Sequence, residues 1–166
     1  MTGLDTIREC MTDCLVRAGV QAVTAWDKGN KTRREGPVVA VTLRSCRGEP
    51  SGFRDYLGER YNAGLGRWEE LYGKKVKVTF GLEIYSAGRD GAARCQTAFD
   101  QVADGLQNGA PAGLALAELS RGETEYDRET GLFHCPAQAV CDAYLYAVAD
   151  EGGTFVDFEV RGEGKR

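Results

Sequence analysis

The sequence predicts an α+β fold: a mainly antiparallel sheet with two helices packed on one face and projecting β-hairpin or loop arms. Two adjacent patterns carry this prediction. Between Val76 and Tyr85 apolar and polar residues alternate, as in a strand with one buried face. Between Ala92 and Leu106 apolar residues recur every three or four positions, as in an amphipathic helix. Strands interrupted by only two helices favour the α+β class.

Size and composition predict one globular domain over residues 1–166. Within it, we expect residues 46–74 to form a projecting arm or long loop and residues 161–166 to form a frayed tail. The net charge of −4 provides no basic surface, so nucleic-acid binding through phosphate neutralisation is disfavoured. No stretch approaches the roughly 18 apolar residues of a membrane-spanning helix. The first residues lack a signal-peptide pattern, so we expect the chain to stay in the cytosol.

The first part of the chain predicts one helix and two strands. Residues 4–18 carry an apolar helical stripe, Thr2 and Asp5 resemble a capping box, and Gly19 ends the helix. Residues 20–26 and 36–44 are typical of strands, and we expect them to pair as an antiparallel hairpin.

Residues 45–74 lack a long regular pattern, although they are rich in aromatic residues and their charges balance. A segment of this length suggests a functional role. Within it, residues 61–68 predict a tight turn that joins two short strands. Residues 126–133 repeat the same arrangement: Asn or Asp opens the turn and Gly takes a positive-φ position. We interpret both as tips of β-hairpins.

The last part of the chain predicts the second hairpin and a closing strand. Asn108, Gly109 and Pro111 end the central helix, Gly109 by tolerating a left-handed cap. Residues 113–125 and 132–148 form the two arms of the hairpin. Pro136 indicates an edge, a bulge or a bend there, because proline cannot donate a hydrogen bond to its neighbour. Residues 154–160 alternate as a last strand.

No residue pattern indicates catalysis, a metal or a cofactor. The six cysteines include no Cys-x-x-Cys pair, so we expect buried or half-buried free thiols and no zinc site. The single histidine, His134, adjoins Cys135, but strand neighbours point to opposite faces, so they cannot act together. Carboxylates between 118 and 127 suit a solvated face. Residues 88–91 lack the spacing of a phosphate-binding loop, and Asp90 is more simply an N-cap.

Aromatic and arginine side chains on the two expected hairpins favour protein–protein contacts, because Tyr, Trp and Arg are enriched at interface hot spots. The alternative for each residue is packing on its own hairpin or over a sheet edge. We hypothesise that Trp68 and Tyr56 contribute to contacts between subunits or between rings. The candidate interaction residues are Arg54, Tyr56, Arg60, Tyr61, Trp68, Tyr72, Tyr126 and Phe133.

The layout of the chain resembles the tail-terminator and tail-completion (neck) proteins of long-tailed bacteriophages and prophages. The leading helix 7–19, the hairpin 20–44, the arm 47–74, the strand 76–85, the helix 92–106 and the closing strands carry this resemblance. The stretches 55–61 (DYLGERY) and 67–73 (RWEELYG) are similar to uncharacterised proteins from tail-gene clusters of clostridial-type prophages.

This resemblance implies a structural virion protein that assembles as a homo-oligomeric ring, most often a hexamer. The ring would cap the tail-tube protein, end tube growth and meet the head–tail connector protein. It would assemble in the host bacterial cytoplasm and reside in the neck of the virion tail, with no membrane or specific nucleic-acid partner. Other tail, neck or baseplate components remain alternatives, as do a monomeric adaptor and a small ligand-binding domain or enzyme.

Overall fold

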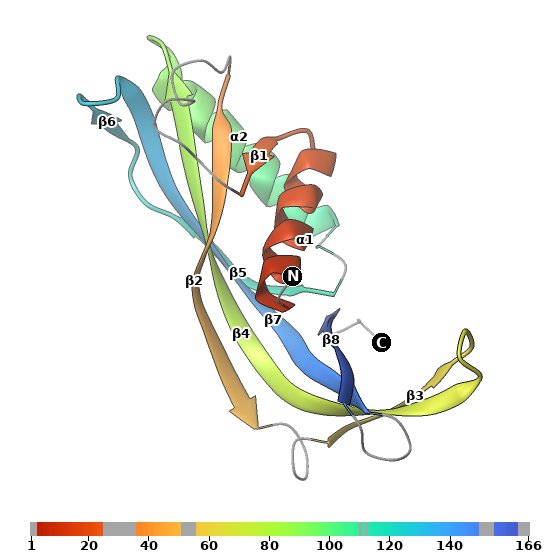
Figure 1. Cartoon of the computed structure of the whole chain (residues 1–166). Coiled ribbons are helices and arrows are strands. Elements are labelled where there is room, and N and C mark those ends of the chain that lie inside the picture. The colour runs from red at the N-terminus through yellow and green to blue at the C-terminus, as the bar shows by residue number, and fades with distance from the viewer. Residues whose placement is uncertain are drawn as a thin grey trace.

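The computed structural model describes residues 3–24, 36–50, 56–109, 111, 113–149 and 155–162. It confirms an α+β fold with two helices and one eight-stranded, mostly antiparallel sheet (Figure 1). In chain order the elements are α1 (Gly3–Arg17), β1 (Gln21–Val23), β2 (Val38–Pro50), β3 (Tyr56–Asn62), β4 (Arg67–Ala87), α2 (Gly91–Asn108), β5 (Ala115–Arg121), β6 (Glu125–Asp127), β7 (Leu132–Ala149) and β8 (Phe155–Gly162).

Two long strands, β4 and β7, form a central antiparallel ribbon. Their register runs from Glu70 opposite Ala149 to Ala87 opposite Leu132. The other edge of β4 pairs first with β3 and then with β2. The other edge of β7 pairs with β6, β5 and β8, in that order along the strand. Figure 1 shows this ribbon curving from the β6 end to the β3 end, so the two predicted hairpins lie at opposite ends of the molecule.

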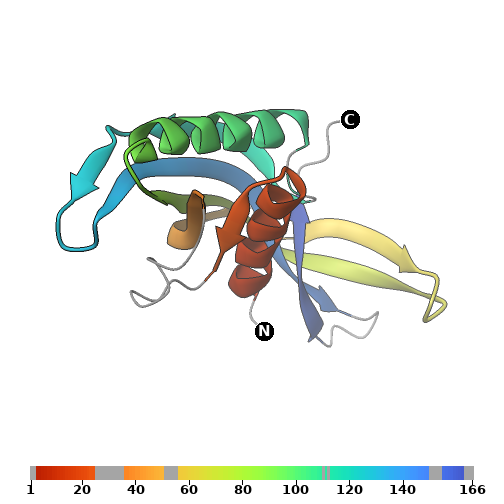
Figure 2. The same cartoon turned by 90° about the horizontal axis from the view of Figure 1, so that it is seen from above.

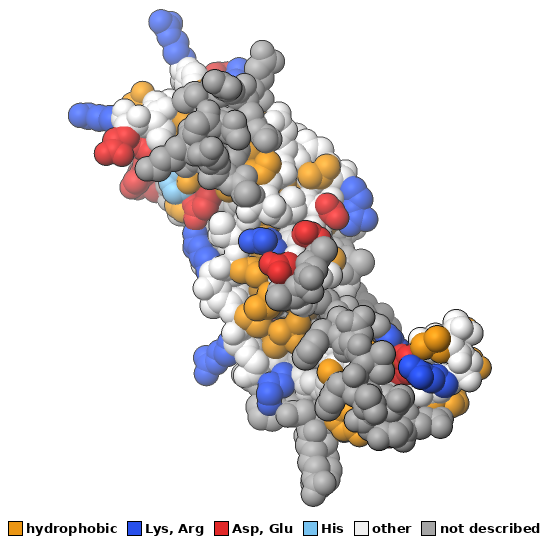
Figure 3. Space-filling view, in the orientation of Figure 1, with side chains coloured by type: hydrophobic (Ala, Val, Ile, Leu, Met, Phe, Trp, Pro, Cys, Tyr) orange, Lys and Arg blue, Asp and Glu red, His pale blue; other side chains and the backbone are white. Residues whose placement is uncertain are grey.

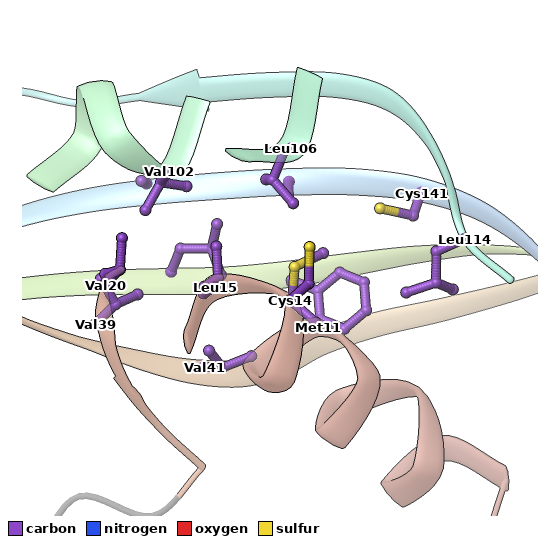
Figure 4. Close-up of a cluster of buried hydrophobic side chains, with 14 of the residues drawn as sticks. Met11, Cys14, Leu15, Val20, Val39, Val41, Val102, Leu106, Leu114 and Cys141 are labelled. Carbon is purple, nitrogen blue, oxygen red and sulfur yellow. The ribbon is translucent and has the colours of Figure 1, made fainter. Parts of the chain in front are cut away.

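Both helices cover the same face of one half of this ribbon, as predicted. Alternate residues of β4 from Val76 to Ile84 are fully or almost fully buried beneath them. Figure 4 shows Met11 and Leu15 of α1 and Leu106 of α2 pointing into this shared core. The other half of the ribbon, with β3, extends beyond the helices (Figure 2).

The expected antiparallel pairing of the first two strands is wrong. β1 is short and pairs in parallel with the start of β2, from Gln21 opposite Val38 to Val23 opposite Ala40. Parallel neighbours need a connection of about a dozen residues or more, and residues 24–37 supply one of that length. β2 instead finds its antiparallel partner in β4.

Residues 45–74 contain more regular structure than the sequence pattern indicates. β2 continues to Pro50, β3 begins at Tyr56, and the strand after the predicted turn is the start of the long β4. The predicted turn is confirmed: Asn62 Oδ1 accepts a hydrogen bond from the Leu65 amide, and Gly66 has φ +62°. At the second tip Asp127 Oδ1 accepts from the Glu129 amide, and Gly131 has φ +71°.

Pro136 lies in β7, which is an internal strand and not the edge that the sequence suggested; it is opposite Glu83 of β4, where the strand on its other side is interrupted. The carbonyl of Pro136 accepts a hydrogen bond from the Gly122 amide, and the neighbouring strand is interrupted there between β5 and β6. In a strand, the amide and carbonyl of one residue point to the same side, so Pro136 faces Gly122 but cannot donate a hydrogen bond back to it.

The ends of several elements differ from expectation. Asp90 precedes α2 but makes no capping hydrogen bond; its carboxylate pairs with Arg94 instead. Gly109 ends α2 with φ −160°, which is extended and not left-handed. β8 includes Arg161 and Gly162, so those two residues do not belong to a frayed tail. The expected cap residue Thr2 lies outside the described residues.

A second hydrophobic cluster lies on the face opposite the helices, where β3 joins the ribbon. Leu71, Tyr146 and Val148 are buried, and Leu57 and Tyr144 pack against them. Gly73 permits this packing, because a Cβ there would lie 2.1 Å from the carbonyl oxygen of Leu145. The cluster anchors the projecting hairpin on the sheet.

Candidate interaction surface

We call the projecting hairpin the arm; it comprises β3, the turn 63–66 and residues 67–72 of β4. It extends away from the helix-covered half of the sheet in both views (Figures 1 and 2). The pairing from Tyr56 opposite Tyr72 to Asn62 opposite Arg67 defines its register. Directly opposed residues share a face, so this register determines which side chains the arm presents together.

Four of the predicted interaction residues gather on one face of the arm, which we call the aromatic face. Trp68 and Tyr72 are four apart on β4, and their partners Tyr61 and Tyr56 lie directly opposite them. The Tyr61–Trp68 and Tyr56–Tyr72 ring centroids are 5.5 and 5.4 Å apart in edge-to-face arrangements.

A β-bulge brings Tyr56 onto this face. Tyr56 and Tyr61 are five residues apart, so a regular strand would point them to opposite sides. The register shifts between Tyr56 and Gly58, where Gly58 has φ +134°. Such an insertion adds one residue to one strand and changes the face of everything beyond it.

The aromatic face is open to solvent. Tyr61 and Trp68 are 55% and 53% exposed, and Tyr56 is 38% exposed. Figure 3 shows hydrophobic side chains gathered on the arm at the lower right of the molecule. Exposed aromatic residues that cluster on one face are typical of protein-interaction sites. Packing within the hairpin half-buries Tyr72 but leaves about half of the surfaces of Tyr61 and Trp68 free, so it does not account for their exposure.

Two carboxylates lie among the aromatic rings. Glu59 and Glu70 are directly opposed in the register and share the face of Trp68. The hydroxyl of Tyr72 donates to Glu70 Oε2 at 2.8 Å, and this hydrogen bond raises the pKa of Tyr72. The sequence-based selection missed Glu59 and Glu70, although their spacing of two from Tyr61, Trp68 and Tyr72 could have indicated a shared face.

The opposite face of the arm is held by a polar network. Glu69 is only 3% exposed, and it accepts hydrogen bonds from Asn62 Nδ2 at 2.9 Å and Arg60 Nε at 3.0 Å. The hydrogen bond from Asn62 is the largest cause that lowers the pKa of the Glu69 carboxyl, and the hydrogen bond and positive charge of Arg60 lower it further. Arg60 also donates to the hydroxyl of Tyr146 at 3.3 Å. Arg60 therefore fastens the arm to β7 and does not belong to the aromatic face.

The remaining predicted residues lie elsewhere. Arg54 is outside the described residues. Tyr126 and Phe133 are at the far end of the ribbon with ring centroids 5.0 Å apart. Tyr126 is exposed, whereas Phe133 packs against the main core. The eight predicted residues therefore do not form one surface.

A polar network on the sheet face away from the helices accounts for the single histidine. His134 pairs with Glu83, which also pairs with Arg44, and the His134 ring stacks on Tyr85 with centroids 4.7 Å apart. Cys135, the neighbour of His134, is buried on the helix side. The two side chains point to opposite faces, which confirms the prediction that they do not act together.

The cysteines are all free, and most are buried or half-buried as predicted. Cys46 is the exception, because it lies exposed on β2. Within the described ranges, no three or more His, Cys, Asp or Glu side chains are placed to hold a metal ion. Two surface grooves of about 370 and 440 Å³ border α1; one is lined by Cys10, Asp13, Val16 and Arg17. The other is lined by Glu9, Thr12, Asp13, Ala22, Val23 and Thr24.

Among the described residues, neither helix is long and apolar enough to cross a membrane. No protein-family model matches the chain, and the search of curated proteins finds no match.

Proposed function

We propose that this chain is a non-enzymatic structural protein that assembles into a homo-oligomeric ring, most simply a hexamer, of the tail-terminator type. In this proposal the ring caps the last layer of tail-tube protein and joins it to the head–tail connector in the neck of the virion. Assembly takes place in the host bacterial cytoplasm, without a cofactor, a membrane or specific nucleic-acid binding.

The observation that carries the proposal is the aromatic face of the arm. The four rings of Tyr56, Tyr61, Trp68 and Tyr72 share one side of a hairpin that projects beyond the helices. The network around Glu69 and the cluster around Leu71 hold this hairpin on the sheet. A rigid arm with an exposed aromatic surface suits contact with a neighbouring subunit, since little conformational entropy is lost on binding.

The open edges of the sheet also support assembly. β1 pairs only with the first residues of β2, and the described strands leave the outer edge of β2 from Thr42 to Gly48 unpaired. Unpaired strand edges invite pairing with another chain, and cyclic closure protects all of them equally.

Two alternatives use the same surface. Another tail, neck or baseplate component would also form rings, and a monomeric adaptor would use the aromatic face to bind one copy of a different protein. The oligomeric state separates the adaptor from the first two. Among the described residues, the grooves beside α1 are what supports a small-ligand-binding domain.

The experiment is to measure mass by light scattering and shape by negative-stain electron microscopy, for the full chain alone and mixed with a purified tail-tube protein. Rings of about six subunits, or tubes that stop growing when the chain is added, are the expected result. A compact monomer that leaves tube growth unchanged would overturn the proposal.

A further inference from the structure

We propose that the aromatic face of one copy docks on a basic patch of the next copy, formed by Arg47 on β2 and Lys75 and Lys77 on β4. This inference rests on the proposed ring and names the surface that receives the arm. It follows from the charges of both surfaces and from their positions on the sheet.

The arm supplies an acidic, aromatic surface. Glu59 and Glu70 lie between the Tyr56–Tyr72 and Tyr61–Trp68 pairs. The described cations of the arm, Arg60 and Arg67, occupy the alternate positions and point to the other face. A surface of carboxylates and exposed rings favours a cationic partner, because ammonium and guanidinium groups bind both carboxylates and the faces of aromatic rings.

The basic patch has three cations, and two carboxylate residues of the same chain lie opposite them in the register: Glu49 opposite Lys75 and Asp142 opposite Lys77. Arg47 and Lys77 are directly opposite each other across β2 and β4, and Lys75 lies two residues from Lys77 on the same face. Arg47 is exposed, and Lys77 is 56% exposed with Asp142 Oδ1 at 3.6 Å as its carboxylate contact. Like charges directly opposed in a sheet are destabilising, so an incoming carboxylate near Arg47 and Lys77 would relieve the repulsion within that pair.

The free edge of β2 makes the patch accessible. Residues 44–48 are all exposed, and in Figure 1 no described strand lies outside this part of β2. Charged residues on an edge strand can also serve only to prevent aggregation. That role requires no acidic partner, so the experiment below separates the two.

The two surfaces cannot meet within one chain. Trp68 and Tyr72 are separated from Val76 and Val78 by an even number of residues, so by strand alternation the aromatic face is on the helix side of β4. Lys75 and Lys77 occupy the alternate positions, so they face the other side. One copy therefore presents the arm in one direction and the patch in the other. Contact between two different surfaces of identical chains is heterologous, and such contacts close into rings when the rotation between copies permits.

The test uses charge reversal in the full-length chain. One variant, E59K/E70K, reverses the arm; a second, R47E/K77E, reverses the patch. Matched controls with the same change in net charge are E123K/E129K and R89E/R128E, whose residues are all exposed. Self-association is measured by analytical ultracentrifugation at low and high salt, and circular dichroism verifies folding.

We expect each reversed variant to self-associate about tenfold more weakly than the wild type or its matched control, with wild-type association weakening at high salt. An equimolar mixture of the two reversed variants should regain association, because each arm then meets a patch of opposite charge. Reversed variants that associate like the wild type, a mixture that does not recover, or a wild type that remains monomeric would each overturn the inference.

The outcomes also distinguish this inference from the proposed function. Rings that persist after charge reversal would overturn the basic patch as the receiving surface and leave the ring intact. Charge-dependent association into dimers or open chains would support the docking contact and overturn the ring.

Discussion

Trp68 lies directly opposite Tyr61 across the arm, edge to face at 5.5 Å, and both rings remain more than half exposed. The two rings pack on each other and still present most of their outer surface to solvent. Their mutual contact therefore explains their local order and leaves a large aromatic area available to a partner.

The first prediction concerns Trp68→Ala. Because the side chain is half exposed, its loss should lower the free energy of unfolding by no more than about 1.5 kcal/mol, the size of one aromatic pair. Assembly should weaken much more, since central aromatic residues contribute about 2 kcal/mol or more at interfaces. Thermal unfolding followed by circular dichroism and sedimentation velocity measure the two effects.

Tyr126→Ala is the matched control for Trp68→Ala, because Tyr126 is 55% exposed at the other end of the ribbon. Its loss should lower the free energy of unfolding by a similarly small amount, because Tyr126 also pairs with one ring, that of Phe133, but it should leave assembly nearly unchanged. If Trp68→Ala unfolds the chain, Trp68 is a packing residue and not an interaction residue.

Gly73→Ala should destabilise the fold. The added Cβ would lie 2.1 Å from the Leu145 carbonyl oxygen and 2.6 Å from Tyr146 Cα, and both are backbone atoms that cannot rotate away. We expect a loss of about 2–4 kcal/mol in the free energy of unfolding. Urea denaturation measures this loss.

Gly48→Ala tests whether any glycine replacement in the sheet has this effect. The nearest atom to its added Cβ is the flexible Lys74 Cδ at 3.4 Å. Its effect should be less than about 1 kcal/mol. Equal losses in the two variants would disprove the close approach at Gly73.

The sequence predicts the centre of the fold well. Val76–Tyr85 and Ala92–Leu106 each bury one face, so their apolar periods are 2 and about 3.6 and identify a strand and a helix directly. The turns at Asn62 and Asp127 are predictable because their chemistry is local. The parallel pairing of β1 is not, since three residues carry little pattern and their partner is chosen by long-range contacts.

The aromatic face could be predicted only in part. Trp68 and Tyr72 share a face by simple alternation, but Tyr56 joins Tyr61 only through the bulge before Gly58. One inserted residue reverses every assignment beyond it, and no local pattern identifies it. The structural role of Arg60 could not be predicted either, because it depends on a contact with Tyr146, 86 residues later in the sequence.

Acid should loosen the arm through Glu69. Its hydrogen bonds with Asn62 and Arg60 lower its pKa in the folded state. A lowered folded pKa contributes stability that is complete above the unfolded carboxyl value of about 4.3 and is lost as the pH falls through the folded value. The fluorescence of Trp68, in a chain where Trp26 is replaced by Phe, should therefore change below about pH 4.

Glu69→Gln should remove this acid transition, because the amide does not titrate. Glu70→Gln is the matched control, since Glu70 lies on the open aromatic face and should leave the transition in place. Identical pH profiles for the parent and Glu69→Gln would contradict the assignment to Glu69.

The last prediction concerns the thiols. Partial burial raises the pKa of Cys46, but Cys46 is the exposed cysteine, so it should react with a thiol reagent at pH 8 ahead of the half-buried Cys10, whose pKa is raised by burial and by Asp13 and Glu9. Burial raises the pKa of Cys95 to about 11 and that of Cys141 to about 12, so both should remain almost unreactive until the chain unfolds. Cys46→Ser should therefore abolish the fast phase, and guanidinium should release all six thiols of the parent chain.

Elemental analysis of the purified protein should find less than one zinc per chain, because the cysteines lack the spacing of a zinc site. A fast phase that survives in Cys46→Ser, or stoichiometric zinc, would show that these cysteines form a reactive or metal-binding site.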